Sequence, residues 1–314
     1  MTVTIRDVAR AAGVSVTTAS RAFNNKDDVS AATRARVMAA AQALGYMPNL
    51  VARGLILGKT GALGVVIADG ANPVYTETLR GIEAVANRAG YSLLLCNAGE
   101  SQEQALRCLT TLLHNRVEGI VLTPVQTDRR DIERLQAAGV PFVLALRYFP
   151  DLPTDYVAPD HALGSYLVAR HLLELGHRRL AHIAGPTHLS SAAGRLAGYR
   201  RALAEAGLAC EERHVVSGPF TIAGGYEAGL RLLTGNDRPS AIVAGNDLQA
   251  IGALKAARAL GLRVPDDVAL AGGDDIPLMD MLEVPLTTFH VPLFEIGARA
   301  AAVLLAKLAG QTQD

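Results

Sequence analysis

Residues 13–25 read GVSVTTASRAFNN, and this stretch decides how the start of the chain folds. Gly13 is suited to end a preceding helix, and the Ser15 hydroxyl can cap a second helix that runs to about Phe23. Two short helices joined by a glycine-containing turn are typical of the helix-turn-helix arrangement. The stretch therefore predicts a small helical unit at the beginning of the chain.

The flanking sequence completes this unit, which we call the head. Thr4 can cap a first helix over 5–12, and Ser30 can cap a third helix over 31–44. Gly45 then ends the third helix in the left-handed conformation that glycine adopts at little cost. The head is therefore predicted to be all-α, with three helices.

The second helix of the head has two unlike faces. Small or apolar side chains on one face can pack on the neighbouring helices, whereas hydroxyls and an arginine lie on the other. Short hydroxyl side chains let a helix approach the major groove closely, and an arginine fork matches O6 and N7 of guanine. An amphipathic helix with a solvated polar face is the alternative. The polar-face residues are Val16, Thr17, Ser20 and Arg21.

Charge is divided unevenly along the chain. Residues 1–58 hold seven basic and three acidic side chains, whereas the other 256 residues hold 23 basic and 27 acidic ones. A net charge of +4 on residues 1–58 and −4 on the rest predicts a polyanionic partner for this first part of the chain only.

Composition excludes several classes of protein. In the 314 residues, no apolar run approaches the roughly 20 that a membrane helix needs. The first residues lack the pattern of a signal peptide, so we expect a cytoplasmic protein. The three cysteines, Cys96, Cys108 and Cys210, are too far apart to indicate a disulfide framework or a zinc site.

Two changes of pattern predict the domain organisation. Pro48 and three glycines interrupt residues 46–62, which indicates a hinge, and alternating apolar strands and amphipathic helices follow. The expected divisions are a DNA-binding domain (1–47), a hinge helix or linker (48–60), an N-terminal lobe (61–158 with 290–314) and a C-terminal lobe (159–289).

Continuous apolar strands separated by helices indicate parallel sheets that are covered on both faces. The fold class is therefore an α/β core of two doubly wound lobes, in which ligands bind beyond the carboxyl ends of the strands. Strands are expected at 63–68, 91–98, 119–125, 141–146, 180–185, 214–218, 241–245 and 268–273. Helices are expected at 76–88, 102–114, 163–175, 195–206, 223–233, 248–260 and 293–309.

The chain resembles the LacI/GalR family of bacterial transcriptional repressors over nearly its whole length. The similarity is carried by TIRDVARAAGVSVTTASRAFNN, VSAATRARVMAAAQALGYMPNLVARGL, NPVYTETLRGIEAVANRAGY, DHALGSYLVARHLLELGHRRLAHIAGP and AGNDLQAIGALKAARALGLRVPDDVALAGGDD. The resemblance implies a homodimer that reads a near-palindromic operator, and a core like periplasmic binding proteins that binds a small effector. It also implies a dimer rather than a tetramer, because no leucine-heptad tail follows the last predicted helix.

The resemblance also assigns DNA contacts. Val16 and Thr17 would face bases with Arg21 beside them, and Leu55 would wedge into the minor groove next to Ala52 and Arg53. Two departures stand out: Gly54 weakens a hinge helix, and Asp27 and Asp28 should repel phosphate. The phosphate-binding positions are Ser15, Thr18, Asn24 and Thr33.

The effector positions follow strands of the predicted core. Hydroxyl-rich ligands such as a sugar, a sugar acid or a nucleoside need Asn, Asp and Arg partners, because each hydroxyl both donates and accepts. Arg147 and Arg195 together would suit a clamp for a carboxylate or phosphate; the alternative is that they form surface ion pairs. Asn246 and Asp274 also have structural alternatives, a helix cap and a turn respectively. The implied positions are Asn72, Tyr75, Arg147, Arg195, Asn246, Asp247 and Asp274.

Other functional classes have less support. A solute-binding or transport receptor would need a signal peptide and no basic head. An enzyme would need a nucleophile or an acid–base pair, and no such group can be placed. GLILGKT at 54–60 is one residue short of a phosphate-binding loop, and His171, His177 and His182 fall on different predicted elements. We therefore expect no cofactor, no metal and no catalytic activity.

Overall fold

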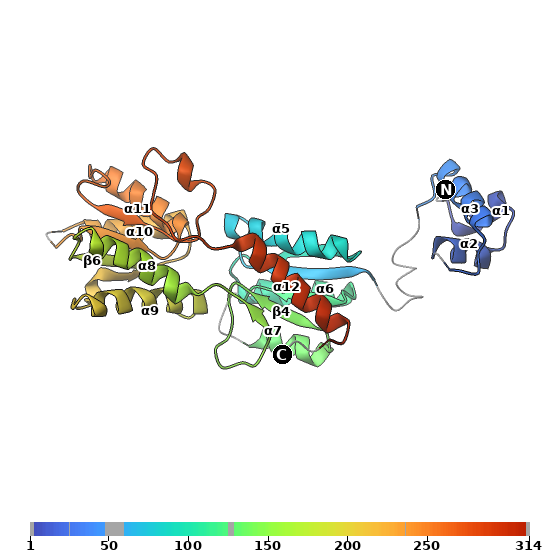
Figure 1. The fold of residues 1–314 in the computed structure, drawn as a ribbon, viewed down its shortest axis with the longest axis horizontal. Helices are drawn as coiled ribbons and strands as arrows, with labels where there is room; N and C mark the ends of the chain where they lie inside the picture. The colour runs from blue at the N-terminus through green and yellow to red at the C-terminus, as the bar shows by residue number, and fades with distance from the viewer. Residues whose placement is uncertain (1–2, 25, 48–59, 125–128, 236, 312–314) are drawn as a thin grey trace. The chain divides into compact units, whose positions relative to one another are not determined.

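The computed structural model describes residues 3–24, 26–47, 60–124, 129–235 and 237–311. The chain divides into two compact units, Met1–Thr60 and Gly61–Asp314, each of which is described by itself (Figure 1). The hinge positions Ala52, Arg53, Gly54 and Leu55 lie outside the described residues, as does Asn25.

The head folds into the three predicted helices, α1 (Ile5–Ala12), α2 (Val16–Phe23) and α3 (Ala31–Ala43). Local polar groups set their ends: the Asp7 carboxylate accepts a hydrogen bond from the Thr4 amide at 3.0 Å, and Ser15 Oγ accepts one from the Thr18 amide at 3.0 Å. Gly13 and Gly45 both have φ of +63°, as their role as helix ends predicts. A small core of Val8, Ala9, Ala12, Ala19, Ala22, Val29, Val37 and Ala41 holds the helices together.

The N-terminal lobe contains a parallel five-stranded sheet in the order β2-β1-β3-β4-β5. The sequence predicts the first four strands but misses the two-residue β5 and helix α7. The strands are β1 (Ala62–Ile67), β2 (Ser92–Asn97), β3 (Gly119–Leu122), β4 (Phe142–Ala145) and β5 (Tyr156–Val157). The helices between them are α5 (Pro73–Arg88), α6 (Gln102–His114) and α7 (Arg130–Ala138).

The C-terminal lobe contains a parallel four-stranded sheet in the order β7-β6-β8-β9. Its strands are β6 (Leu180–Ala184), β7 (Val215–Ser217), β8 (Ala241–Ala244) and β9 (Ala269–Ala271). Its helices are α8 (His161–Glu174), α9 (Ser190–Glu205), α10 (Ile222–Leu233) and α11 (Asp247–Ala259), with single 3-10 turns at Glu212–His214 and Met279–Met281. The predicted fold class is confirmed, because both sheets are parallel and alternate with helices.

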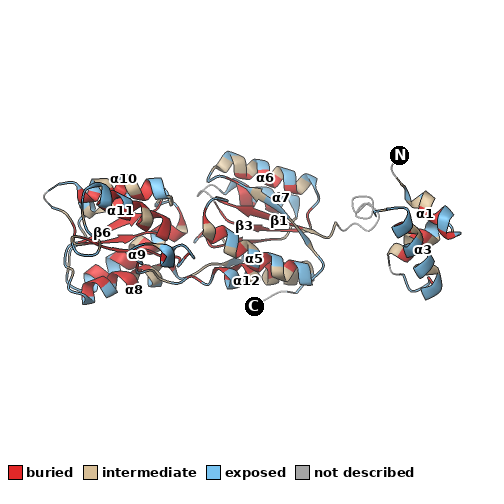
Figure 2. Cartoon of the chain, turned by 90° about the horizontal axis from the view of Figure 1, so that it is seen from above, coloured by how far each residue is buried: buried red, intermediate tan, exposed pale blue. Residues whose placement is uncertain are grey.

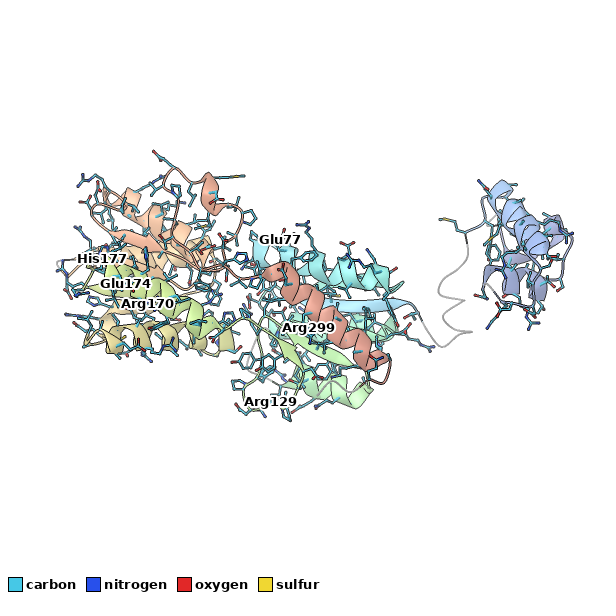
Figure 3. All side chains as sticks on the ribbon, in the orientation of Figure 1. Glu77, Arg129, Arg170, Glu174, His177 and Arg299 are labelled. Carbon is cyan, nitrogen blue, oxygen red and sulfur yellow. The ribbon has the colours of Figure 1, made fainter. Side chains whose placement is uncertain are left out.

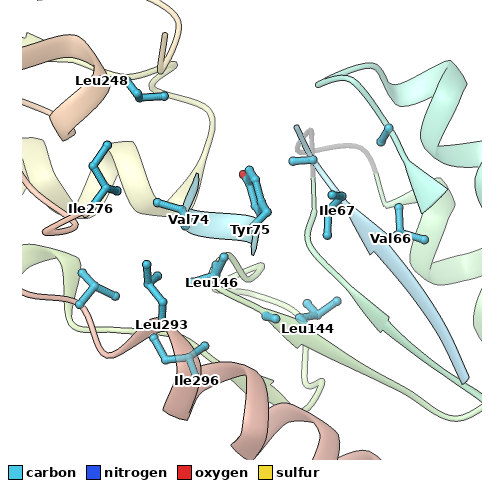
Figure 4. Close-up of a cluster of buried hydrophobic side chains, with 14 of the residues drawn as sticks. Val66, Ile67, Val74, Tyr75, Leu144, Leu146, Leu248, Ile276, Leu293 and Ile296 are labelled. Atoms are coloured by element: carbon cyan, nitrogen blue, oxygen red, sulfur yellow. The ribbon is translucent and has the colours of Figure 1, made fainter. Parts of the chain in front are cut away.

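Helices cover both faces of each sheet (Figure 2). Every residue of β3, β4, β6 and β8 is buried, which explains why these strands read as continuous apolar runs. Apolar side chains of both lobes also meet in one cluster, in which Val74 and Leu293 lie with Leu248 and Ile276 (Figure 4).

Charged side chains on the outer helix faces pair with near neighbours. On α8, Arg170 and Glu174 lie one turn apart, with 3.2 Å between Nε and Oε1 (Figure 3). Exposed pairs of this kind contribute at most about 1 kcal/mol each, so burial of the apolar strands dominates the stability. Within the described part of the chain, each helix is too short or too polar to span a membrane.

The last helix, α12 (Leu293–Leu308), returns to the N-terminal lobe and packs along α5, where it also contacts β3, β4 and β5 (Figure 1). Two glycines make this close crossing possible. A Cβ on Gly297 would lie 1.9 Å from the Thr78 carbonyl oxygen, and a Cβ on Gly81 would lie 2.0 Å from that of Phe294.

Gly297→Ala is expected to lower the free energy of unfolding by about 1–3 kcal/mol, because backbone atoms of α5 must move to admit the methyl group. Urea unfolding followed by far-UV circular dichroism measures this change. At an open position in a helix, a glycine-to-alanine substitution would instead raise the free energy of unfolding by about 1 kcal/mol. Such a gain in stability would contradict the close crossing of α12 and α5.

Candidate functional site

A small cavity of about 40 Å³ lies where the two lobes meet, at the carboxyl ends of their strands. Its walls come from the start of α5, the end of β4, the first turns of α8, α9 and α12, and the loops after β7, β8 and β9. Six of the seven predicted effector residues line it: Asn72, Tyr75, Arg147, Arg195, Asn246 and Asp274. The other lining residues are Val74, Leu146, Pro159, His161, Ser191, Phe220, Val291 and Leu293.

Arg195 and Asp274 form a buried ion pair in the cavity wall, and each is only 5% exposed. Arg195 Nη2 donates to Asp274 Oδ1, and Nη1 donates to the carbonyl oxygen of Gly245. The guanidinium lies 5.5 Å from the ring centre of Phe220 and 5.3 Å from that of Phe289. Burial raises the pKa of Asp274 to about 6, although Arg195 opposes this, so the carboxylate is charged at neutral pH.

Arg147 is also buried and paired. Its Nη2 lies 2.8 Å from Glu100 Oε1 and its Nη1 lies 3.0 Å from Glu100 Oε2, and Nη1 also donates to the Pro124 carbonyl oxygen at 3.1 Å. Burial alone would lower the pKa of Arg147, but Tyr75 and Glu100 raise it, so the guanidinium stays charged. Glu100 was not among the predicted residues, although it follows the strand 92–97 in the same way as they follow theirs.

Two polar residues of the site hold helix ends, and the predicted effector residue Asp247 lies outside the cavity. Asn72 Oδ1 accepts from the Val74 amide at 3.1 Å, and Asn246 Oδ1 accepts from the Gln249 amide at 2.9 Å, as a helix cap. Asp247 is fully buried and does not line the cavity. Its carboxylate accepts from the Ile276 amide at 2.9 Å and from the Thr288 hydroxyl at 2.7 Å. Asp247 therefore fastens α11 to the chain that follows β9.

Backbone strain is concentrated at this site. Glu100, Leu146 and Asp274 have φ of +53°, +66° and +114°, a region that non-glycine residues rarely adopt. Such conformations cost about 1–3 kcal/mol each and persist where the surrounding structure enforces them, often at binding sites. The strain supports a functional role for the cavity.

Two more buried polar residues line the cavity and were missed by the sequence analysis. His161 starts α8 shortly after the two-residue β5, and Ser191 lies one turn before Arg195. Ser191 Oγ, His161 Nδ1 and Arg195 Nε are buried and have no hydrogen-bond partner among the described residues. The described residues contain no group of three or more His, Cys, Asp or Glu that could hold a metal ion.

The head presents the predicted polar face on α2. Ser15, Thr17 and Arg21 are exposed, and Val16 is 43% exposed although it is apolar. The predicted phosphate-binding residues Thr18, Asn24 and Thr33 are half-buried, as is Ser20. This face is therefore accessible, as a groove-reading helix requires.

Arg21 has a partner that the sequence analysis did not foresee. Its Nη2 lies 2.9 Å from Asp28 Oδ2, and both side chains are about half exposed. Asp28, which was expected to repel phosphate, is thus also attracted to Arg21 on the same surface. Asn24 donates from Nδ2 to the Ser20 carbonyl oxygen at 2.9 Å and closes the end of α2.

A helix-turn-helix head joined to a two-lobed α/β core with a polar cavity defines a class of ligand-controlled DNA-binding proteins. Residues 4–49 match the bacterial regulatory proteins of the lacI family, and residues 169–314 match the periplasmic binding protein-like domain. The chain belongs to the LacI family. It is a DNA-binding transcriptional regulator that a small-molecule effector controls.

Several relatives match over almost their whole length. The chain is 38% identical to the ribose operon repressor of Escherichia coli (strain K12), over 98% of this chain and 94% of that protein. It is 35% identical to catabolite control protein A of Priestia megaterium, over 100% of this chain and 95% of that protein. The first of these relatives is named a repressor and the second a control protein.

Solved structures show the same architecture. The lac repressor dimer bound to operator and the anti-inducer ONPF superposes with a TM-score of 0.88 at 30% identity, covering 99% of this chain and 94% of that one. The transcriptional regulator CelR in complex with cellobiose superposes with a TM-score of 0.77 at 33% identity, covering 99% and 95%.

Proposed function

We propose that this regulator is a repressor whose affinity for a near-palindromic operator is controlled by a neutral, hydroxyl-rich effector in the cavity between the lobes. The observation that carries the proposal is the pairing of both cavity arginines with carboxylates of the same chain. A cavity whose cations are already neutralised favours a neutral ligand over an anionic one.

The cavity offers the partners that a sugar needs. Asn72, Tyr75, Arg195, Asn246 and Asp274 supply donors and acceptors, and Phe220 supplies an apolar ring face. The carboxylate or phosphate clamp suggested by Arg147 and Arg195 is less supported, since Glu100 and Asp274 occupy those cations. Sugars are therefore the first class to test, with ribose among them because the 38% identical relative is named a ribose operon repressor. Asp247 would act indirectly, by fixing α11.

Control of DNA binding would pass through the angle between the lobes. A ligand that contacts both lobes changes that angle, and with it the spacing of the two hinge segments of a dimer. The coupling between effector and operator should be about 1–3 kcal/mol and reciprocal.

The domain boundaries at 47/48, 60/61, 158/159 and 289/290 remain predictions, as do the contacts of Ala52, Arg53 and Leu55 with the minor groove.

One experiment tests the proposal. Purified protein is screened by thermal shift against neutral sugars, their phosphates, sugar acids and nucleosides, and each hit is added to a mobility-shift assay with genomic fragments. We expect a neutral sugar to raise the melting temperature and to change operator affinity. Stabilisation by phosphorylated or acidic ligands alone would contradict the proposed effector class. A chain that shifts no genomic fragment would favour the alternative, a solute-binding receptor.

We propose that the protein acts as a homodimer in the bacterial cytoplasm, at the nucleoid. Support comes from β2, an edge strand of its sheet on which Leu94 and Leu95 are exposed. An exposed apolar edge strand invites pairing with a second chain.

Leu95→Glu is expected to shift the protein toward monomer and to weaken operator binding at least tenfold, because each half-site then binds alone. Leu95 is 49% exposed in the single chain, so its replacement should leave folding intact. Analytical ultracentrifugation measures the oligomeric state. Leu163→Glu on α8 is the matched control, since Leu163 is also exposed, at 45%. If the Leu95→Glu variant remained dimeric, β2 would not be part of the dimer interface.

Arg21→Ala is expected to weaken operator binding by about 1–3 kcal/mol and to relax the preference at one base pair in each half-site. Asp28→Ala should relax the same preference by freeing the guanidinium, yet tighten binding to any duplex because one negative charge is lost. Fluorescence anisotropy with operator and scrambled duplexes separates the two effects. Equal losses on both duplexes for Arg21→Ala would show a phosphate contact instead.

A further inference from the structure

His161 occupies an unusual position at the boundary between the lobes. It is the first residue of α8, lines the cavity and is only 7% exposed. Its Nε2 lies 3.0 Å from the carbonyl oxygen of Leu146, at the end of β4. Its Nδ1 is buried and meets no hydrogen-bond partner within the described ranges.

The partner of Nε2 fixes the chemistry of Nδ1. A backbone carbonyl only accepts hydrogen bonds, so Nε2 must carry the proton of the ring. A neutral imidazole holds one ring proton, which leaves Nδ1 with a lone pair and no hydrogen. Nδ1 is therefore a hydrogen-bond acceptor inside the cavity.

The surroundings keep this ring neutral. Burial, together with the nearby cations of Arg195 and Arg147, lowers the pKa of His161 to about 3, against the effect of the bond to Leu146. Each arginine is itself paired, with Asp274 and Glu100. A second proton on the ring would add a third buried cation to this cluster.

His182 shows what a purely structural buried histidine looks like in this protein. It is completely buried, its Nδ1 lies 2.9 Å from the Val243 carbonyl oxygen, and its ring stacks on Tyr199 at 4.9 Å. Its Nε2 is also unpartnered among the described residues, but His182 does not line the cavity. Of these two histidines, His161 is the one that combines an unpartnered acceptor with a place in the cavity wall.

We propose that Nδ1 of neutral His161 accepts a hydrogen bond from a hydroxyl group of the bound effector. This inference rests on the proposed function and adds a selection rule to it. Arg195 Nε–H is an unpaired donor in the same wall and His161 Nδ1 is an unpaired acceptor, so a hydroxyl can satisfy either. A keto or ether oxygen, or a phosphate dianion, can satisfy only the arginine.

The same ring links the effector to the path of the chain between the lobes. The imidazole accepts from the ligand on one side and donates to Leu146 on the other, and hydrogen bonds in such a chain strengthen one another. Leu146 has a strained φ of +66°, and Arg147 follows it. Binding of a hydroxyl at His161 therefore tightens the contact between α8 and the end of β4.

Two substitutions separate the two nitrogens of the ring. In His161→Asn, the short side-chain amide reaches the place of Nδ1 and keeps an acceptor there. In His161→Gln, the longer amide reaches toward Leu146 and leaves the place of Nδ1 without one. Isothermal titration calorimetry of the full chain is carried out with D-ribose, D-xylose, D-glucose, D-galactose and cellobiose.

For the sugar that the parent binds, we expect His161→Gln to lose about tenfold to a hundredfold in affinity, the usual cost of an unpaired buried group. His161→Asn should recover most of this loss. His182→Gln, which removes a buried imidazole outside the cavity, should leave the affinity unchanged. Parent-like affinity of His161→Gln, or equal losses in both variants at position 161, would overturn the proposal.

A measurement on the parent covers the case in which the variants do not fold. Nitrogen-15 NMR of the histidine rings should show His161 as the neutral tautomer protonated at Nε2, with an Nδ1 resonance that moves on saturation with the bound sugar. An Nδ1-protonated ring, or an Nδ1 resonance that the sugar leaves in place, would overturn the proposal. Failure of the parent to bind any of the five sugars would instead overturn the proposed effector class, and this proposal with it.

Discussion

Asp274→Ala is expected to lower the free energy of unfolding of the core by about 3–5 kcal/mol and to abolish stabilisation by the effector. The substitution leaves Arg195 buried with only the Gly245 carbonyl oxygen as a polar partner. A buried charge without its counter-ion is far more costly than the loss of an exposed ion pair. Urea unfolding, with and without the sugar found by screening, measures both effects.

The neighbouring residue provides a matched control. Asp275 also has a positive φ and an ionic partner, with 2.9 Å between its Oδ2 and His290 Nδ1, but both side chains are exposed. Asp275→Ala should therefore cost under about 1 kcal/mol. Asp274→Asn, which keeps an acceptor for Arg195, should fall between the two. Equal costs at positions 274 and 275 would show that the Arg195–Asp274 pair is not buried in solution.

Acidification from pH 7 to about 5 is expected to destabilise the core by roughly 4 kcal/mol through two buried histidines. Burial lowers the pKa of His161 to about 3 and that of His182 to about 4. The unfolded chain takes up these protons near pH 6.5 and the folded chain does not, so the stability is present above pH 6.5 and is lost as the pH falls. Asp274 acts in the opposite direction, because its raised pKa lets the folded state take up a proton near pH 6 and recover part of the loss.

Unfolding free energies measured at several pH values test this account. His182→Gln should remove about half of the histidine-dependent slope, since each ring contributes about 2 kcal/mol at pH 5. His114→Gln, at an exposed position, should leave the slope as it is in the parent. An unchanged slope in His182→Gln would mean that the ring is protonated in the folded protein.

Local signals explain why the sequence predicted most of the fold. The caps Ser15 and Ser30 and the terminating Gly13 and Gly45 act within a few residues of their own positions, so the head helices were placed correctly. Continuous apolar runs likewise reveal buried parallel strands. The two elements that were missed carry weak signals: β5 has two residues, and α7 is largely charged, with Ile132 and Leu135 as its buried apolar side chains.

The candidate site was predicted only as far as single positions allow. Residues that follow strands reach the cavity because parallel strands end at one edge, and Asn72, Asn246 and Asp274 lie there for this reason. Ion pairs between residues far apart in the sequence could not be predicted from local patterns. Arg147 and Glu100 are 47 positions apart, and Arg195 and Asp274 are 79 positions apart. The same limit explains Asp247, which follows a strand but is turned toward Ile276 and Thr288.

The return of α12 to the N-terminal lobe sets an order in which the molecule can be completed during synthesis. The ribosome releases the chain from its amino end, and domains fold as their residues emerge. The head and the strands and helices of the C-terminal lobe are all made before residues 293–308, whereas α5 lacks its packing partner until that last helix appears. The cavity, which includes Leu293, is therefore finished last. A nascent or prematurely ended chain would carry the DNA-reading head before it has the site that controls it.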